Sequence, residues 1–178
     1  LKFYIAKNVT ENTKYFVGQH GASYFTDHDA NFRTEVNTAD KFFSWGFSNP
    51  KKNIYPAFNF KTFKRNISNN NKGKFLIVCR SLGYNSAPWD RYYEGLQGIK
   101  KTSEIFSLLP PKIKEKSIIR LHHSFRLNRS KYFLNKFFNE SKNHLEFGRI
   151  DYKELIKDSR IICFNYDSTG FLENLTLN

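Results

Sequence analysis

Methionine is absent from the 178-residue chain, and cysteine occurs only twice. Because translation starts at methionine, we interpret the chain as a fragment and expect it to be part of a longer protein. No apolar run approaches the roughly 18 residues of a membrane span, so no membrane-spanning helix is predicted. The opening residues also lack the basic-then-apolar layout of a secretory signal peptide.

The two cysteines, Cys79 and Cys163, each lie inside an apolar run. Buried thiols in strands, without the even set of closely spaced cysteines that makes a disulfide framework, indicate a reducing compartment. Neither cysteine has a histidine at ligand spacing, which disfavours metal binding through them. We therefore predict two core residues and a cytoplasmic protein.

Acidic residues are few, with 16 Asp and Glu against 29 Lys and Arg, and the net charge is +13. This balance favours anionic partners, namely nucleic acid, an anionic membrane surface or a phosphorylated substrate. The basic residues are scattered, and the alternative is that the lysines only solvate the surface. Asp27 and Asp29 have metal-site spacing, but the glycine and glutamate of an EF-hand do not follow them. No carboxylate pair stands out, so no metal is predicted.

Aromatic residues are plentiful, with 19 Phe and 10 Tyr, and we expect them to build much of the core. Short apolar runs alternate with helix-like segments, which indicates parallel strands joined by right-handed crossovers. We predict an α/β fold: one Rossmann-like domain over residues 1–178, whose parallel sheet has helices on both faces. Predicted strands cover 3–6, 15–18, 40–46, 75–79, 117–121, 145–147 and 160–164; predicted helices cover 90–109, 130–139, 151–158 and a last one opening at Ser168; 47–71 is predicted as one long connection.

Two polar motifs at opposite ends of the chain each follow a short apolar run. They are Gln19-His20-Gly21 and Asp167-Ser168-Thr169-Gly170. In an open α/β sheet, ligands bind in the crevice beyond the carboxyl ends of the strands. Two such turns can therefore meet around one ligand, and the residue types favour a phosphorylated, nucleotide-activated donor.

The C-terminal turn is the strongest candidate for an anion site. Ser168, Thr169 and Gly170 stand where backbone N–H groups and the helix dipole favour a phosphate, and small residues let it approach. Glu173 follows one turn later, where its carboxylate can accept hydrogen bonds from ribose hydroxyls or a base. The alternative is an ordinary Ser N-cap with a glutamate nearby, as in a capping box.

Two histidine turns add further candidates. His20 precedes Gly21, which allows a sharp turn, so the imidazole can serve as a general base or phosphate contact. His122, at the end of a predicted strand, can donate to a phosphate oxygen or share a proton. The adjacent His122 and His123 do not suit a metal site, because consecutive side chains are expected to diverge. Gln19, Gly21 and Tyr24 are candidate loop or acceptor contacts.

A third polar turn, Arg80-Ser81, follows the apolar run at 75–79 on what we predict to be the same sheet edge. Arg80 and Ser81 are candidate nucleotide contacts. The turn has no Walker A motif, no dinucleotide glycine fingerprint and no nucleophile elbow.

These landmarks resemble a bacterial family of surface-carbohydrate transferases with a glycosyltransferase-B (GT-B) type fold. The resemblance covers most of the chain and implies one nucleotide-binding domain, truncated, of a two-domain enzyme. The landmarks are Gln19-His20-Gly21-x-x-Tyr24, Ala-Asp-Lys-Phe-Phe-Ser-Trp-Gly at 39–46, Ile119-Arg120-Leu121-His122, and Asn-Tyr-Asp-Ser-Thr-Gly-Phe-Leu-Glu at 165–173.

The same layout is similar to that of polyol-phosphate polymerases that use CDP-glycerol and of transferases that use CMP-activated acid sugars. Those groups place a His-Gly turn, a His-Pro turn and a Ser/Thr-rich turn around the donor phosphate. The resemblance implies that His20 is a base or phosphate contact, that His122 contacts phosphate, and that Ser168 and Thr169 cradle it. The sequence departs from the pattern at His123, where proline is expected, and at Gln19, where the polymerases carry tryptophan.

The expected function is transfer of a sugar or polyol phosphate from a nucleotide-sugar or CDP-polyol donor to a surface-glycan acceptor, with no cofactor. The basic surface suits peripheral contact with the anionic inner membrane, and no specific nucleic-acid partner is expected. One alternative is a nucleotide-sugar epimerase of the same fold, which needs no acceptor. The other is a basic module that binds nucleic acid or an anionic surface, with a steep salt dependence.

Overall fold

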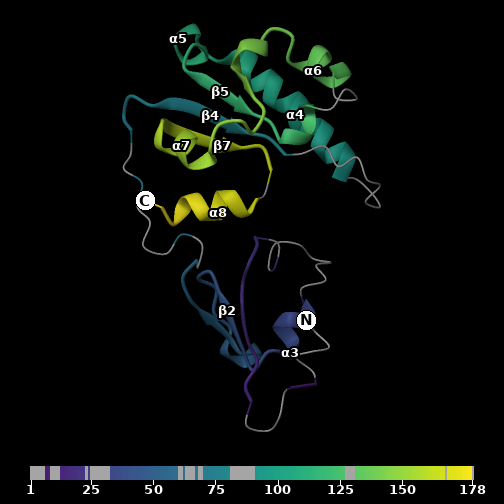
Figure 1. Ribbon diagram of the computed structural model, residues 1–178, viewed down its shortest axis with the longest axis vertical. Helices are drawn as coiled ribbons and strands as arrows, with labels where there is room; N and C mark the ends of the chain where they lie inside the picture. Colours follow the sequence, from purple (N-terminus) through teal and green to yellow (C-terminus); the bar gives the residue numbers. More distant parts are fainter. Residues whose placement is uncertain are drawn as a thin grey trace. The chain divides into compact units, whose positions relative to one another are not determined.

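Two separate parallel sheets organise the chain. The computed structural model describes residues 7–8, 13–22, 24, 33–59, 62, 67, 70–80, 91–126, 131–166 and 168–177, without the side chains of 33 and 91–94. It divides into two compact units (Figure 1): unit 1 comprises Leu1–Asn66 and Ser168–Leu177, and unit 2 comprises Ile67–Asp167. The expectation of one continuous sheet is wrong, because each unit has its own sheet. Membership in a longer two-domain protein stays a prediction.

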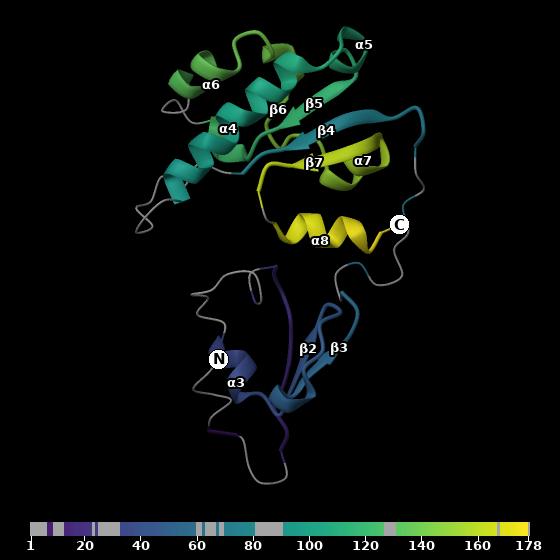
Figure 2. The ribbon, with the colours of Figure 1, turned by 180° about the vertical axis from the view of Figure 1, so that it is seen from behind.

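Unit 2 has a four-stranded parallel sheet in the order β6-β5-β4-β7, which Figure 2 shows from behind. Numbered from the first strand of the unit, this order is 3-2-1-4, the order in which a Rossmann sheet begins. Each crossover returns the chain to the same end of the sheet, so all four carboxyl ends lie along one edge. The strands are β4 (Lys74–Val78), β5 (Ser117–Arg120), β6 (Leu145–Glu146) and β7 (Ser159–Phe164).

Helices cover both faces of this sheet, as Figure 1 shows for α4 and α6 on one side and α7 on the other. Neighbouring side chains of a strand point to opposite faces, and β4 therefore supplies Ile77 to one core and Leu76 to the other. The fully buried Phe125 and Phe138 belong to the first core, which matches the expected aromatic content. The helices of this unit are α4 (Arg91–Leu108), α5 (Pro111–Lys114), η2 (His123–Arg126), α6 (Lys131–Phe137), η4 (Lys142–His144) and α7 (Tyr152–Lys157).

Unit 1 has a three-stranded parallel sheet in the order β1-β2-β3. Phe42 of the central strand is fully buried and packs with Tyr24, Val36 and Ile54. Helix α8 also belongs to unit 1. The hydroxyls of Thr62 and of Thr176, at the C-terminal end of α8, form a hydrogen bond of 2.6 Å. The elements are β1 (Phe16–Gly18), α3 (Arg33–Thr38), β2 (Lys41–Ser44), η1 (Pro50–Lys52), β3 (Ile54–Pro56) and α8 (Thr169–Leu175).

The elements predicted from sequence are confirmed within the described residues, and the strand expected at 3–6 lies outside them. Three short elements of unit 1 were missed, namely α3, η1 and β3. Strand β3 lies inside the stretch predicted as one long connection, and its three residues end in Pro56. A strand this short has no periodicity to detect, which explains the omission.

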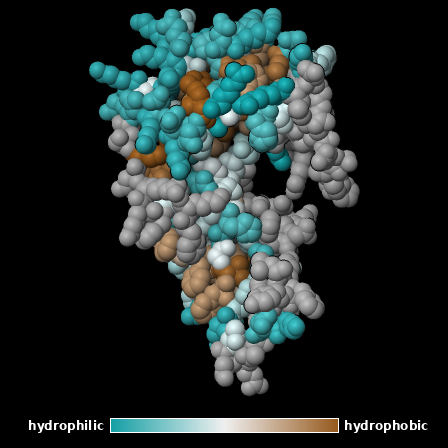
Figure 3. Space-filling model, viewed as in Figure 1, coloured by the Kyte–Doolittle hydropathy of each residue, from teal (hydrophilic) through white to brown (hydrophobic). Residues whose placement is uncertain are grey.

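Figure 3 shows hydrophilic residues over much of the visible face of unit 2, with smaller hydrophobic areas between them. Among the described helices, none combines the length and the apolar character that a membrane crossing requires.

Gly73 is expected to tolerate no side chain. A Cβ there lies 2.7 Å from the Arg160 nitrogen and 2.7 Å from the Asp158 oxygen, and both are backbone atoms that cannot rotate away. Gly73→Ala should therefore destabilise unit 2 by about 2 kcal/mol through overpacking. Urea unfolding followed by far-UV circular dichroism measures this loss.

Gly21→Ala is the matched control, because a Cβ at Gly21 has its nearest neighbour, Thr169 Oγ1, at 3.5 Å. The control should unfold close to the wild-type midpoint. Equal midpoints for Gly73→Ala and the wild type would show that the start of β4 can separate from β7 at no cost.

Candidate functional site

The turn after β1 is shaped by the side chain of Gln19, which is only 6% exposed. Its Nε2 donates to the Gly21 carbonyl at 2.8 Å, and its Oε1 accepts from the Trp45 backbone N–H at 2.8 Å. Its own backbone N–H donates to the Phe43 carbonyl, also at 2.8 Å. Gln19 therefore uses its amide to fasten the turn to the end of β2.

The structure brings together the two polar turns that the sequence places 147 positions apart. The backbone N–H of Ala22 donates to Thr169 Oγ1 at 3.3 Å. Gly21 lies beside the same hydroxyl, and its φ is not among the positive values found in the described residues. The meeting of the Gln19–Ala22 turn with the Ser168–Gly170 turn is thus confirmed, and a left-handed Gly21 is not its cause.

His20 contacts the hydroxyl of Tyr24, which in turn is bound by Glu35. Its Nδ1 lies 2.6 Å from the Tyr24 hydroxyl, and that hydroxyl donates to Glu35 Oε2. Tyr24 is 5% exposed whereas His20 is exposed, so a buried residue anchors an exposed one. Burial first, and the Glu35 carboxylate second, raise the pKa of Tyr24 far above its ordinary value. Sequence reasoning missed Glu35, because it lies in the short helix α3 that no pattern indicated.

Ser168 is the N-cap of α8. Its Oγ accepts from the Phe171 backbone N–H at 3.1 Å, its backbone is extended, and the residue is 8% exposed. The N-cap alternative weighed for this turn is therefore confirmed. The capping-box variant is wrong, because Phe171 occupies the third helical position and Glu173 lies two residues further on.

In unit 2, Asn165 joins the ends of the two strands between which the strand order reverses. Its Oδ1 accepts from the Arg80 backbone N–H at 2.9 Å, and its backbone N–H donates to the Val78 carbonyl at 3.2 Å. Its Nδ2 donates to Thr102 Oγ1 on α4 at 3.1 Å. Gly98 makes room for it, since a Cβ there would lie 3.3 Å from Nδ2. Arg80 thus leaves β4 at the switch point, and Ser81 lies outside the described residues.

His122 follows β5 and has a definite tautomer. Its Nδ1 accepts from the Ser124 backbone N–H at 3.3 Å and lies 2.9 Å from Ser124 Oγ. A nitrogen that accepts from a backbone N–H carries no proton, so the proton of the neutral ring is on Nε2. Partial burial, and then the neighbouring His123, lower the pKa of His122. The ring is therefore a neutral hydrogen-bond donor at physiological pH.

The expectation that the two adjacent histidine side chains diverge is wrong. The ring centroids of His122 and His123 are 4.0 Å apart, with planes inclined by 41°. The 3-10 turn that begins at His123 folds the second ring back over the first. Within the described part of the chain, no group of three or more His, Cys, Asp or Glu residues could hold a metal ion.

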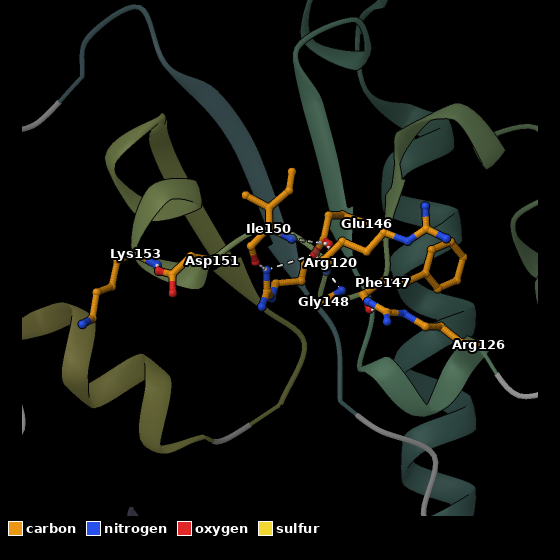
Figure 4. A network of polar contacts seen from close by, with 9 residues as sticks. Arg120, Arg126, Glu146, Phe147, Gly148, Ile150, Asp151 and Lys153 are labelled. Atoms are coloured by element: carbon orange, nitrogen blue, oxygen red, sulfur yellow. Dashed lines mark hydrogen bonds and ion pairs between the residues drawn. The ribbon is translucent and has the colours of Figure 1, made fainter.

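A buried carboxylate organises the backbone beside this histidine turn (Figure 4). Glu146, 8% exposed, pairs with Arg120 at 2.9 Å. It also accepts backbone N–H groups from Gly148 at 2.9 Å, from Ile150 at 3.0 Å and from Arg149. Burial alone would raise the pKa of Glu146, but the three N–H donors and the guanidinium outweigh it and lower the pKa.

The geometry also explains why residue 148 is glycine. Its φ is +70°, a left-handed backbone conformation that side chains disfavour, and a Cβ there would lie 3.7 Å from the His123 Cβ. The Glu146 carboxylate therefore holds a tight loop directly against the histidine turn. The sequence analysis did not single out Glu146, because a lone glutamate in a short strand has no distinguishing pattern.

Cys79 is a core residue, as predicted. It is 4% exposed, and burial raises the pKa of its thiol to about 12, against a smaller opposing effect of the Thr102 hydroxyl. Cys163 is half-buried, and both thiols are free.

With its parallel sheet, its helices on both faces and its strand order 3-2-1-4, unit 2 has a Rossmann-like α/β fold. The family model for LIC12162 family transferases matches residues 1–178, and the chain belongs to this family. The chain is accordingly a transferase. It matches none of the curated proteins and none of the solved structures compared with it.

Glu146→Gln should lower the free energy of unfolding by about 2 kcal/mol at pH 7, because an amide accepts its backbone and Arg120 hydrogen bonds less strongly than a carboxylate. Folding depresses the pKa of Glu146, so its stabilisation is fully present above the unfolded value of about 4.3. It is lost as the pH falls through the lower folded pKa. The deficit of the variant should therefore shrink in acid, as urea unfolding across a pH series would show.

The exposed Glu140→Gln is the matched control and should follow the wild type at every pH. A deficit for Glu146→Gln that stays constant from neutral pH into acid would contradict a stabilising charge at this position.

Proposed function

We propose that this transferase has a GT-B type fold and moves a sugar or polyol phosphate from a nucleotide-activated donor to a surface-glycan acceptor. The chain would supply the donor-binding part. One observation carries the proposal: the hydrogen bond from Ala22 to Thr169, which unites the His-Gly turn with the Ser-Thr-Gly turn. Membership in a transferase family and the 3-2-1-4 order of unit 2 support it.

The C-terminal turn is the proposed phosphate cradle, with Thr169 as its main donor. Thr169 Oγ1 accepts the hydrogen bond from the Ala22 N–H, and its own hydroxyl proton can therefore be donated to a phosphate oxygen. Ser168 likewise accepts from Phe171 with a lone pair and keeps its hydroxyl proton. Gly170 contributes a backbone without a side chain, and Glu173 is proposed to accept from ribose hydroxyls.

Histidines supply the remaining chemistry in this proposal. His20 is the base that takes the proton of the acceptor hydroxyl. His122 contacts a phosphate oxygen through Nε2–H, which its hydrogen bonds to Ser124 make the protonated nitrogen. Such a donor stabilises negative charge as the nucleotide leaves, without requiring a charged imidazole. Arg80, at the switch point of unit 2, and Ser81 are proposed nucleotide contacts.

Partners and location follow from the same proposal. The donor is a nucleotide sugar or a CDP-polyol, the acceptor is a growing glycan, and no cofactor or metal takes part. The net charge of +13 suits a cytoplasmic protein that contacts the anionic inner membrane peripherally.

A thermal-shift screen against CMP, CDP, UDP, GDP and their sugar or glycerol conjugates tests the proposal. One nucleotide series should raise the melting temperature selectively, since ligand at 100 times its Kd stabilises by about 2.7 kcal/mol. Thr169→Val should lose most of the shift, because it removes the hydroxyl but keeps the shape. Thr169→Ser restores the hydroxyl and should recover the shift, each variant being compared with its own ligand-free melting temperature.

Two results would overturn the proposal. The absence of any nucleotide shift, together with tight and salt-sensitive binding of DNA or RNA, would indicate a charge-driven binding module. Conversion of the donor to a stereoisomer without any acceptor would instead indicate a nucleotide-sugar epimerase.

A further inference from the structure

We propose that Tyr24 and Glu35 are positioning residues that hold His20 in one tautomer, with the proton on Nδ1 and the proton-accepting lone pair on Nε2. The role in catalysis rests on the proposed function, in which His20 is the base. The tautomer itself is a property of the folded chain and can be measured without any substrate.

The side chains of His20, Tyr24 and Glu35 all belong to unit 1. The Tyr24 hydroxyl lies between two partners, His20 Nδ1 at 2.6 Å and Glu35 Oε2. The imidazole and phenol rings stand edge to face, with centroids 5.0 Å apart and planes at 87°. This arrangement points the ring edge of His20 that carries Nδ1 at the hydroxyl.

The number of available protons decides which group donates in each of the two hydrogen bonds. A phenol has one proton, and a carboxylate can only accept hydrogen bonds. The proton of Tyr24 is therefore used on Glu35, and the phenol oxygen faces His20 as an acceptor. His20 Nδ1 must then be the donor. In a neutral imidazole only one nitrogen carries a proton, so Nε2 is the unprotonated nitrogen.

Packing in the core of unit 1 keeps this arrangement in place. Tyr24 packs in the core of unit 1, where its ring centroid lies 5.1 Å from that of Phe42, and α3 brings Glu35 to its hydroxyl. Because burial and Glu35 raise the pKa of Tyr24, the phenol keeps its proton when the neighbouring histidine changes charge. An exposed ring is thus oriented by a buried residue whose own position is fixed by packing.

The consequence for the proposed reaction follows from the tautomer. The proton of the acceptor hydroxyl moves to His20 Nε2, the acceptor oxygen bonds to the donor centre, and the bond from that centre to the nucleotide phosphate breaks. The imidazolium that forms keeps its Nδ1–H on Tyr24, and Tyr24 keeps its proton on Glu35. The carboxylate thereby stabilises the positive charge through one intervening hydroxyl, with no further proton transfer.

Long-range ¹H–¹⁵N correlation spectra of the ¹⁵N-labelled chain test the tautomer directly. At about pH 8, where an ordinary histidine is neutral, His20 should show a protonated Nδ1 and an unprotonated Nε2. His122 should show the reverse pattern and serves as an internal reference. Tyr24→Phe keeps the packed ring but removes the acceptor, and His20 should then shift toward the Nε2–H form.

Glu35→Gln provides a second variant that leaves the core untouched. Its amide can donate to the phenol oxygen, which frees the Tyr24 proton to turn toward His20 and should weaken the preference for Nδ1–H. Tyr55→Phe is the matched control: Tyr55 lies in β3 and contacts Lys41, and its loss should leave the His20 signals unchanged.

An Nε2–H tautomer for His20 in the wild-type chain would overturn the inference, as would a pattern that Tyr24→Phe leaves unaltered. These results are separable from failure of the proposed function. A chain that shows the Nδ1–H tautomer but binds no nucleotide upholds the inference about Tyr24 and Glu35 and rejects the donor. A chain that binds a nucleotide but has His20 in the Nε2–H tautomer supports the nucleotide donor and rejects the inference about Tyr24 and Glu35.

Discussion

Parallel pairing of strands is the constraint on which the rest of this structure depends. A parallel strand cannot be reached by a tight turn, so each strand is followed by a crossover that returns the chain to the starting end of the sheet. In unit 2 this places the residues that follow β4, β5 and β7 along one edge. Arg80, His122 and Asn165 come from separate parts of the sequence, and they share this edge for that reason alone.

Polar side chains, rather than apolar packing, give the turns at these edges their shape. Gln19 binds backbone groups of Gly21 and Trp45. Asn165 binds the Arg80 backbone and the Thr102 hydroxyl, and Glu146 binds the Arg120 guanidinium and the backbone of residues 148–150. Each is buried or half-buried, where a lost hydrogen bond is costly because water cannot replace it. Loops held in this way keep their histidines and hydroxyls in place, as the proposed site for an anionic ligand requires.

The sequence was most informative where a pattern is local. Apolar runs such as 75–79 indicated strands, and Ser168 was recognisable as a possible N-cap. The division into two sheets was not predictable, because the apolar pattern of a strand does not identify its pairing partner. β3 was too short and α3 too weakly patterned to be detected.

The same reasoning applies to the candidate site. The two end motifs each follow a predicted strand, and on that ground we expected that their turns can meet; they do, through Ala22 and Thr169. The residues that orient the histidines could not be found in this way. Glu35 and Asn165 are ordinary polar residues in sequence, and their importance arises from tertiary contacts alone. The folding-back of His123 likewise depends on a 3-10 turn that the sequence did not reveal.

Unit 1 is assembled from two segments that flank unit 2 in the sequence, whereas unit 2 is one continuous segment. This has a consequence for synthesis on the ribosome. Domains usually fold in the order in which they emerge, the N-terminal one first. Here Leu1–Asn66 emerge before unit 2 but lack α8, which is translated after it. Unit 2 can therefore complete its sheet before unit 1 has all of its elements, and the segment that completes unit 1 follows unit 2 in synthesis.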